Sequence, residues 1–580
     1  MLLSSLPLEL LAHIAKKVPR LKDRKSLRLT CVLLGEVLKP HVLASVTLNI
    51  HGHNLEPGFS LLQALVEEQE ALQVGSAMIS GLSKHIRKLY VAALAPTFYP
   101  ESDADFEKKQ KLFDYLYQGE EQIRKWHTVE PKGLHESRTS HTCDLTCRYL
   151  TCGSRYLDLR VTKPAVEPRS PECENKLRLL LKPALGSLDN LTAIHWSWHY
   201  SDSDWTLDTL YECLESDKFL SKIKDFTLSY RPENCIPPLR IPKLPELRRL
   251  SFCIYLGDAE LDRLFQHPTI SNNPNLTTLS ITLQQDHFPH YMSFPGSIPE
   301  TVVDLDLNGL KFANLEHVIS GNLTSLDLSA SKMANDESWA SLWETLSLQQ
   351  IRLQKLALGQ SSSPEDMRKL LEYLSSYSGL ESFSLTKIHW YPSYSAHAVY
   401  FYTHILPRHA KTLVNLELKP LYESSWCVGA DSIDAIEQCR CLRTLSIRVN
   451  HKGLDPDPDP NPERASVGSL YEDQNIPELC DQNSVHLLLQ TIALSLPNLE
   501  KLTIEPATTL TFINDPLNFA MNEGQFYLGK RRRIRASVES FARRSDQLWK
   551  VFKWVQIYVH NQKMELEPRW EWRYIAPSEI

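Results

Sequence analysis

Several stretches of this sequence contain residue types that bind metals or carry out catalysis. Histidines and cysteines gather in HESRTSH at His135–His141 and CDLTCRYLTC at Cys143–Cys152. Thiolates and imidazoles bind zinc when their spacing is suitable. The two histidines are not placed as in the HExxH zinc site, and the three cysteines do not have the spacing of standard zinc modules. We therefore expect no metal and no cofactor, and we interpret these thiols, like those of Cys439 and Cys441, as buried packing residues.

Carboxylates lie on two segments in which apolar residues alternate with polar ones, VVDLDLN at 302–308 and LTSLDLS at 323–329. If each segment forms a strand, alternate side chains point to opposite faces, and Asp304, Asp306 and Asp327 share the polar face. Neighbouring strands would then bring three carboxylates together in an acidic patch able to bind a basic partner segment. The alternative is an ordinary solvated strand face.

A basic run opens the C-terminal part of the chain, at Lys530, Arg531, Arg532 and Arg533. Such a run can act as a nuclear import signal or a nucleic-acid contact. Apolar residues then recur at helical spacing at Ile534, Val538 and Phe541, and a strand-like alternation follows at Val555–Val559. The plainer interpretation is therefore a helix and a strand that cap the fold, with the arginines facing solvent.

Length and composition limit the class of protein. A chain of 580 residues is too long for one ordinary core, so we expect several domains or a repeat array. A net charge of −7 creates no overall attraction for nucleic acid, which is not an expected partner. We find neither a signal peptide nor an apolar stretch long enough to span a membrane. Twelve scattered cysteines favour a reducing compartment, so the expected location is cytoplasmic and/or nuclear, with no membrane contact.

The opening stretch LSSLPLELLAHIAKKV, residues 3–18, predicts a helix with Pro7 in its first turn. Leu10, Ile14 and Val18 form one stripe, while further leucines point elsewhere, so the helix is apolar on more than one side. Asp23 is expected to cap a second helix that runs on to Leu34, and Pro40 interrupts a third short segment at 37–43. Three helices in about 45 residues rarely stand alone, so we expect another protein and the rest of the chain to share in covering them.

This N-terminal region resembles an F-box, because the pair Leu6–Pro7, then Leu10 and Ile14, and later Leu27, Leu29 and Cys31 fall where that motif places its own residues. In the F-box family this helical unit binds the adaptor subunit of an SCF-type, cullin-based ubiquitin ligase. The resemblance implies that the adaptor-binding residues are Leu6, Pro7, Leu8, Leu10, Ile14, Leu27 and Leu29. Val32 and Leu33 depart from the pattern, which often has lysine or serine there.

The spacing LxxLxL recurs through most of the remaining chain. Its first residues are Leu191, Ile223, Leu247, Leu276, Val302, Leu323, Leu353, Leu380, Leu413, Leu442 and Leu499, with a weaker copy at Ile86. From Leu191 to Leu442 successive copies start 21 to 33 residues apart, which leaves room for a strand and a crossover in each. Such strands bury a continuous core only when many copies stack. The chain thus resembles an irregular leucine-rich-repeat protein of the fungal F-box type.

These resemblances together imply an α/β fold in three parts: a three-helix F-box at 1–48, an irregular leucine-rich-repeat solenoid at 49–510 with a parallel sheet on its concave face, and a capping helix and strand at 511–580. An insertion is expected at about 92–153, and proline-rich loops without regular structure at 163–176 and 454–466. The implied function is that of a non-enzymatic substrate receptor, in which the F-box binds the adaptor and the repeats bind an unknown protein target. The alternative is a non-ligase scaffold or nuclear regulator that uses the repeats for protein interaction.

Overall fold

The structure of the chain is a computed structural model. It describes residues 6–18, 21–30, 32–51, 54–74, 81–96, 171–198, 202–230, 242–254, 264, 267–271, 273–283, 292–293, 298–315, 319–333, 336–359, 363–388, 394–450, 454–455, 483–508, 516–545, 555–559, 562–566 and 572–574. These residues form two compact units. Unit 1 contains the described residues up to Ser325 together with Lys332 and Met333, and unit 2 contains Leu326–Ser331 and the described residues from Asp336 onward.

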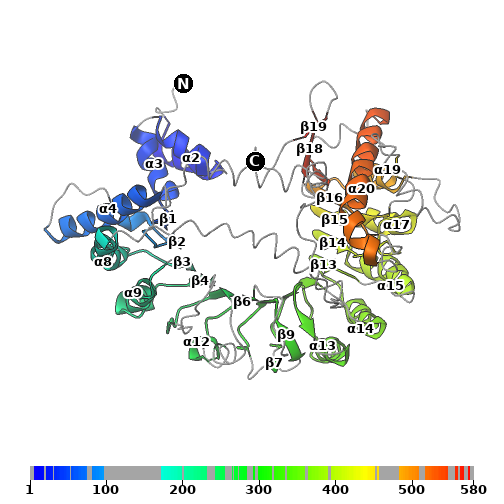
Figure 1. Cartoon of the computed structure of the whole chain (residues 1–580), viewed down its shortest axis with the longest axis horizontal. Coiled ribbons are helices and arrows are strands. Elements are labelled where there is room, and N and C mark those ends of the chain that lie inside the picture. Colours follow the sequence, from blue (N-terminus) through cyan, green and yellow to red (C-terminus); the bar gives the residue numbers. More distant parts are fainter. Residues whose placement is uncertain are drawn as a thin grey trace, which may run out of the picture. The chain divides into compact units, whose positions relative to one another are not determined.

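Unit 1 is built on a parallel sheet whose strands follow one another in chain order (Figure 1). Each strand pairs in parallel with the next, as Leu279 does with Leu305. The strands are β1 (Ser45–Asn49), β2 (Lys88–Ala93), β3 (Ala193–Trp198), β4 (Asp225–Tyr230), β5 (Arg249–Ile254), β6 (Thr278–Leu283) and β8 (Asp304–Asn308). A second, small parallel sheet consists of β7 (Met292–Ser293), β9 (Lys311–Asn314) and β11 (Lys332–Met333).

The helices of unit 1 include an N-terminal group of three and a series that alternates with the strands. They are α1 (Leu8–Lys17), α2 (Leu21–Arg28), α3 (Val32–Val42), α4 (Leu55–Gln73), the short 3₁₀-helix η3 (Ser83–His85), α8 (Pro171–Gly186), α9 (Asp204–Leu214), α10 (Asp217–Leu220) and α12 (Pro268–Ser271). Helices α4, α8 and α9 lie on the same side of the strands in Figure 1. The apolar side chains of the strands therefore have a helical layer to pack against.

Unit 2 repeats this α/β arrangement. Its strands are β12 (Lys355–Leu358), β13 (Ser382–Thr386), β14 (Asn415–Lys419), β15 (Thr444–Val449), β16 (Lys501–Pro506), β17 (Gln556–Val559), β18 (Gln562–Leu566) and β19 (Trp572–Tyr574), and β10 (Ser325–Leu328) lies at its boundary. Its helices are α13 (Asp336–Leu348), α14 (Pro364–Ser375), α15 (Tyr394–Tyr400), the π-helical η5 (Phe401–Ile405), α16 (Leu406–His409), α17 (Ala430–Glu437), α19 (Ser484–Ser495) and α20 (Pro516–Arg544). Pairing is parallel from β12 to β17 and antiparallel from β17 to β19.

The leucine spacing explains these strands. In the copy at Leu413, this residue is buried in the turn, and Leu416 and Leu418 are buried on β14 while Glu417 between them is half-buried. Alternate side chains of a strand point to opposite faces, so the two leucines enter the core and the polar residue takes the other face. Every one of the eleven predicted copies begins two residues before a strand, and so does the copy at Ile86. The prediction of parallel strands is confirmed within both units.

Several helix boundaries differ from the sequence predictions. The second helix ends at Arg28, and Asp23 lies inside its first turn instead of capping it. Leu34 belongs to α3, which continues through Pro40 to Val42 although the proline removes one main-chain donor from this helix. Helix α8 begins at Pro171, inside the stretch expected to have no regular structure, since proline is well tolerated in a first helical turn.

The elements near the predicted part boundaries are as follows. Strand β1 starts at Ser45 and pairs with β2, so the sheet begins inside the range assigned to the F-box. The C-terminal helix starts at Pro516, earlier than the basic run, and two antiparallel strands follow the predicted strand. The predicted insertion lies almost wholly outside the described residues, as do residues 456–466 of the proline-rich loop.

Candidate protein-interaction surfaces

The three N-terminal helices share a small core. Leu11 of α1 and three residues of α3, which are Leu34, Leu38 and Val42, form a buried cluster. The three α3 residues are spaced four apart and so lie on one face of that helix. Leu6, Leu27 and Val37 are partly buried against the cluster. Leu6 and Leu27, which were expected to face an adaptor, therefore contribute to this core.

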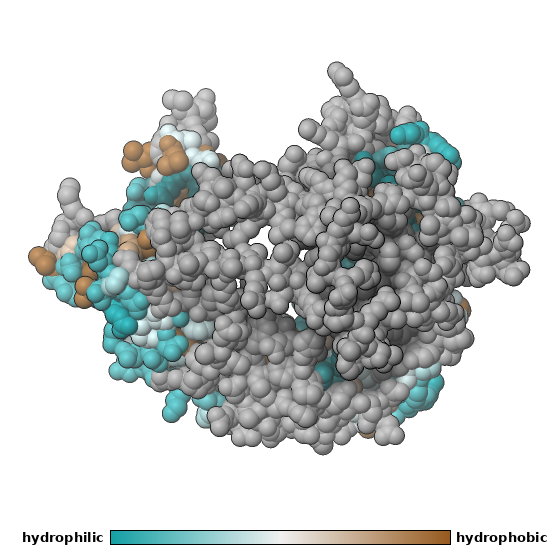
Figure 2. All heavy atoms as spheres, in the orientation of Figure 1, coloured by the Kyte–Doolittle hydropathy of each residue, from teal (hydrophilic) through white to brown (hydrophobic). Residues whose placement is uncertain are grey.

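Other residues expected to contact the adaptor are exposed. Leu10 is 52% and Ile14 is 37% exposed, and their spacing of four places them on the same face of α1. Pro7 is exposed at the start of the helix, and Leu29 is exposed at the end of α2, whereas the side chain of Leu8 lies outside the described residues. Figure 2 shows apolar residues, coloured brown, on the surface of the N-terminal helices.

The sequence prediction did not assign a contact to the start of α3. Val32 is 85% exposed, as is Leu29 just before it, and Leu33 is also exposed. The sequence spacing could have indicated that Val32 and Leu33 are exposed, since a helix that buries positions 34, 38 and 42 turns positions 32 and 33 away from that face. Leu29, Val32 and Leu33, named here the α2–α3 surface, are thus three exposed apolar side chains around one turn.

The polar face of the unit 1 sheet carries a row of aligned side chains. The strand register places Tyr90, His195, Thr227, Ser251, Ser280 and Asp306 side by side across six strands. The rings of Tyr90 and His195 stack with their centroids 4.6 Å apart, and burial lowers the pKa of His195. This row presents hydroxyl groups and two aromatic rings.

Only two of the three aspartates of the predicted acidic patch lie on this sheet of unit 1. Asp304 and Asp306 share β8, and Asp306 accepts hydrogen bonds from Ser280 Oγ at 2.8 Å and from Asn308 Nδ2 at 2.6 Å. Asp327 lies on β10 in unit 2 and accepts a hydrogen bond from the backbone N–H of Ser329. Because Asp327 belongs to unit 2 and the other two aspartates to unit 1, the acidic patch stays a prediction.

The polar face of unit 2 carries an ion-pair network across four strands. Lys419 Nζ lies 2.8 Å from Glu417 and 3.0 Å from Glu505, and Arg448 lies 3.4 Å from the other oxygen of Glu505. Ser384 Oγ donates to Glu417 at 2.7 Å. Burial alone would raise the pKa of Glu417, but the hydrogen bonds from Lys419 and Ser384 lower it. The negative charges of the two carboxylates are therefore balanced by the positive charges of Lys419 and Arg448.

The basic run on α20 is integrated into unit 2. Lys530 is only 3% exposed, pairs with Glu423 and donates to the Ala507 carbonyl at 2.7 Å. Its pKa is lowered by burial, which the nearby Glu423 carboxylate opposes. Arg533 donates to the carbonyls of Leu454 and Asp455 at 3.0 and 3.1 Å. Lys530 is therefore not accessible to an import receptor in this conformation, and the contacts suit a capping helix.

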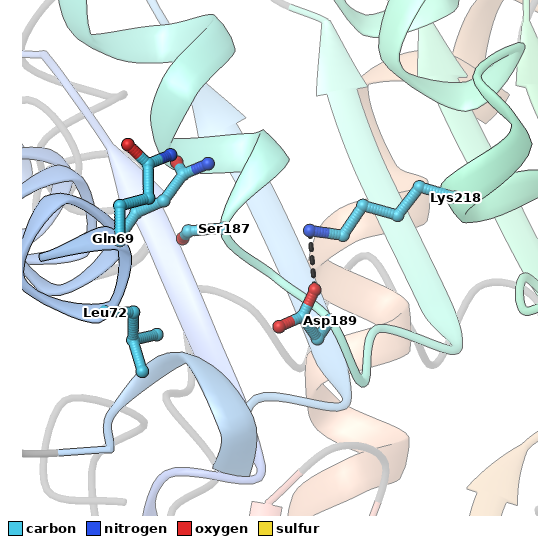
Figure 3. A pocket seen from close by; sticks show the side chains of 6 residues that line it. Gln69, Leu72, Ser187, Asp189 and Lys218 are labelled. Atoms are coloured by element: carbon cyan, nitrogen blue, oxygen red, sulfur yellow. Dashed lines mark ion pairs between the residues drawn. The ribbon is translucent and has the colours of Figure 1, made fainter. Parts of the chain in front are cut away.

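A small cavity of about 270 Å³ lies beside α4 in unit 1 (Figure 3). The Lys218 ammonium lies 2.5 Å from the Asp189 carboxylate, and the Ser187 hydroxyl donates to the Ala184 carbonyl. Because these polar groups are already paired, and sites for small molecules are usually about 300 Å³ or larger, the cavity offers no evident chemistry.

Within the described residues, no three His, Cys, Asp or Glu side chains are grouped so as to hold a metal ion. The predicted thiol cluster at Cys143–Cys152 lies outside the described residues. Cys439 is buried, as predicted, and burial raises its pKa to about 12, whereas Cys441 is exposed and not a packing residue. Among the helices described, none combines the length and apolar character needed to cross a bilayer.

Comparison with known proteins adds no family to these observations. No protein-family model matches the chain, and a search of curated proteins found no matching sequence.

Proposed function

We propose that this protein is the substrate-recognition subunit of an SCF-type cullin ubiquitin ligase, whose F-box-like helices bind the adaptor and whose leucine-rich repeats bind a protein target. The observation that carries the proposal is the exposure of Leu10 and Ile14 on a three-helix group whose described side chains include a core of four buried residues. Apolar side chains on a small helical group gain stability when a partner covers them. The motif resemblance indicates that this partner is the adaptor.

The two α/β units supply the second half of the proposed function. Each copy of the leucine spacing turns its polar residues to the same face of a parallel sheet, so a target can contact side chains from many strands at once. In this proposal the chain performs no covalent step. It holds target lysines close to a ubiquitin-charged enzyme that other subunits supply, and the gain comes from proximity.

The test is recovery of the adaptor with the full-length chain. The wild-type chain is expected to bind the adaptor in equal amounts, and the double variant Leu10→Asp, Ile14→Asp is expected to lose it. The matched control is Leu494→Asp with Val399→Asp, because these residues are 65% and 50% exposed on helices of unit 2. Circular dichroism and thermal unfolding of all three chains establish that each is folded.

The outcomes separate the two functional hypotheses. Loss of adaptor binding in the α1 variant, with the control unaffected, supports the receptor function. If the folded wild-type chain recovers no adaptor, the ligase function is wrong, and the alternative of a non-ligase scaffold remains. The target itself can be sought by proximity labelling with and without residues 1–48.

A further inference from the structure

The amino-terminal edge of the unit 1 sheet carries a group of basic side chains. In three of the four copies of the leucine spacing from Ile86 to Leu247, the two residues after the first apolar residue include a lysine or an arginine. These side chains are exposed, and they are named here the β2–β5 basic edge: Arg87, Lys88, Lys224, Arg248 and Arg249. Among the residues that the structure describes, only Arg249 of this group has an ion-pair partner, which is Asp225 at 2.8 Å.

Backbone hydrogen bonds place the basic residues next to one another in successive strands. The Thr192 N–H donates to the Arg87 carbonyl and the Lys224 N–H donates to the Thr192 carbonyl, both at 2.9 Å. The Arg248 N–H then donates to the Lys224 carbonyl at 2.8 Å. Since neighbouring strands lie about 4.8 Å apart, the backbone distance from Arg87 to Arg248 is about 14 Å. An extended peptide rises about 3.3 Å per residue, so about five residues cover this edge.

The strand face beside the edge adds an aromatic ring to these charges. Lys88 and Arg249 belong to one register row, and two residues after Lys88 comes Tyr90, which stacks on His195 and is 38% exposed. Burial lowers the pKa of His195, and the positive charges of Lys88 and Arg249 also lower it, so both cations lie near this ring. A partner at the edge therefore meets positive charge and an exposed aromatic side chain together.

The excess of positive charge belongs to unit 1 and is not a property of every copy. At the same positions of the copies in unit 2, the charged residues are Lys355, Glu381, Arg443, Glu500 and Lys501. Arg443 and Glu500 lie 3.6 Å apart, so opposite charges compensate each other between neighbouring copies there. Uncompensated like charges repel one another, and a surface of one sign attracts ligands of the opposite sign. The β2–β5 basic edge therefore suits a negatively charged partner.

The distribution of charge favours a peptide over a nucleic acid. Asp225 lies within the basic row on β4, and Asp304 occupies the same row on β8. A nucleic acid carries a phosphate on every nucleotide and would meet these carboxylates, whereas a peptide can place a neutral residue opposite each of them. Thr227 and Ser251 follow on the next row of the same face, and their hydroxyl groups can bond to peptide N–H and carbonyl groups.

We infer that the β2–β5 basic edge binds an acidic segment of the protein target, whose Asp and Glu side chains pair with Arg87, Lys88 and Arg248. The inference rests on the proposed function, because it names the chemistry of the target that the repeats bind. The pair of Arg249 and Asp225 is an example, inside unit 1, of a carboxylate bound at this edge. Arginine suits the role, since its planar N–H groups match the two oxygens of a carboxylate.

The experiment is fluorescence anisotropy of a labelled peptide with the full-length chain at low salt. The acidic peptide contains the run Asp-Glu-Asp-Glu-Asp between Gly-Ser ends, and the reference peptide has Asn and Gln in place of Asp and Glu. The wild-type chain is expected to bind the acidic peptide more tightly than the reference peptide. The variant Lys88→Ser, Arg248→Ser is expected to raise the Kd of the acidic peptide about fivefold or more, since an exposed ion pair contributes up to about fivefold in affinity and two are lost.

The matched control is Lys355→Ser with Arg443→Ser. It removes one lysine and one arginine from the same positions of two copies in unit 2, and its Kd should equal that of the wild type. Circular dichroism of the three chains establishes that each is folded. Raising the salt concentration should weaken the binding of the acidic peptide to the wild type, because exposed charges are screened.

The outcomes distinguish this inference from the proposed function. If the two peptides bind the wild type equally, or if the unit 1 variant binds the acidic peptide as tightly as the control does, the inference is wrong, and recovery of the adaptor still decides the ligase function. If the acidic peptide binds through Lys88 and Arg248 but no adaptor is recovered, the surface holds and the ligase function is wrong. If single-stranded RNA displaces the acidic peptide at a lower concentration than unlabelled peptide does, the edge belongs to a nucleic acid and the inference is overturned. Binding of a phosphoserine peptide in place of the Asp and Glu peptide also overturns it.

Discussion

Replacing Lys530 tests whether the basic run is structural. In Lys530→Met the partly buried Glu423 carboxylate loses its ammonium partner, and the Ala507 carbonyl loses a hydrogen bond of 2.7 Å. Breaking a buried ion pair by removing one partner costs about 3 to 5 kcal/mol. Because the Glu423 side chain remains 14% exposed and keeps some water, we expect the lower end, about 3 kcal/mol. For a unit of this size that is a fall of about 6 to 12 °C in Tm.

Differential scanning calorimetry of the full-length chain measures this loss. The control is Arg543→Gln on the same helix, whose side chain is 70% exposed and whose loss should change Tm by less than about 1 °C. The double variant Lys530→Met, Glu423→Leu should recover most of the loss, since the carboxylate that lost its ammonium is then absent. If Lys530→Met is as mild as Arg543→Gln, the ion pair does not anchor α20 and the capping role assigned to this run is refuted.

Two further predictions concern the core of unit 2. His409 is buried, its Nδ1 accepts from the Leu380 N–H, and burial lowers its pKa, so the neutral ring is the folded form. The contribution of His409 to the free energy of unfolding should be fully present above about pH 6.5 and should fall by up to about 1.4 kcal/mol per pH unit below it. In His409→Gln, urea unfolding should show a smaller loss of stability over the same pH range. A Cβ on Gly359 would lie 1.5 Å from the Ser329 carbonyl oxygen, so Gly359→Ala should cost about 3 kcal/mol. The control is Gly321→Ala in unit 1, where a Cβ meets nothing within 4 Å and should cost under about 1 kcal/mol. Equal urea midpoints for the two variants would contradict the close approach at Gly359.

The repeat strands could be predicted because their signal is local. In copies such as Leu413–Leu418 three apolar residues at fixed spacing specify a turn residue and two strand residues of the same face, and no distant contact is needed to recognise them. The same holds for the first helix, where Pro7 and the spacing of Leu10 and Ile14 are sufficient. The face of α20 that carries Ile534 and Val538 was also evident from its period, and both residues are buried.

Other features depended on which surfaces meet in the fold. Helix α8 begins at Pro171 in a stretch rich in proline, and its Leu177 and Leu181 are buried, so packing favours a helix that local composition argued against. Leu6 and Leu10 are both apolar residues of the opening segment, yet Leu6 lies against the core while Leu10 is exposed. Periodicity identifies an apolar stripe, but it cannot decide how wide a stripe the neighbouring helices will cover.

The sequence alone therefore determined the α/β class, the positions of the repeat strands and their parallel pairing within each unit, because these follow from side-chain alternation over a few residues. Only the tertiary structure decided that Lys530 is buried on Glu423, that Asp306 is held by Ser280 and Asn308, and that Leu29 and Val32 remain exposed. Burial and charge pairing arise from contacts between residues that are distant in the chain, and the spacing of residue types along the sequence does not show these contacts.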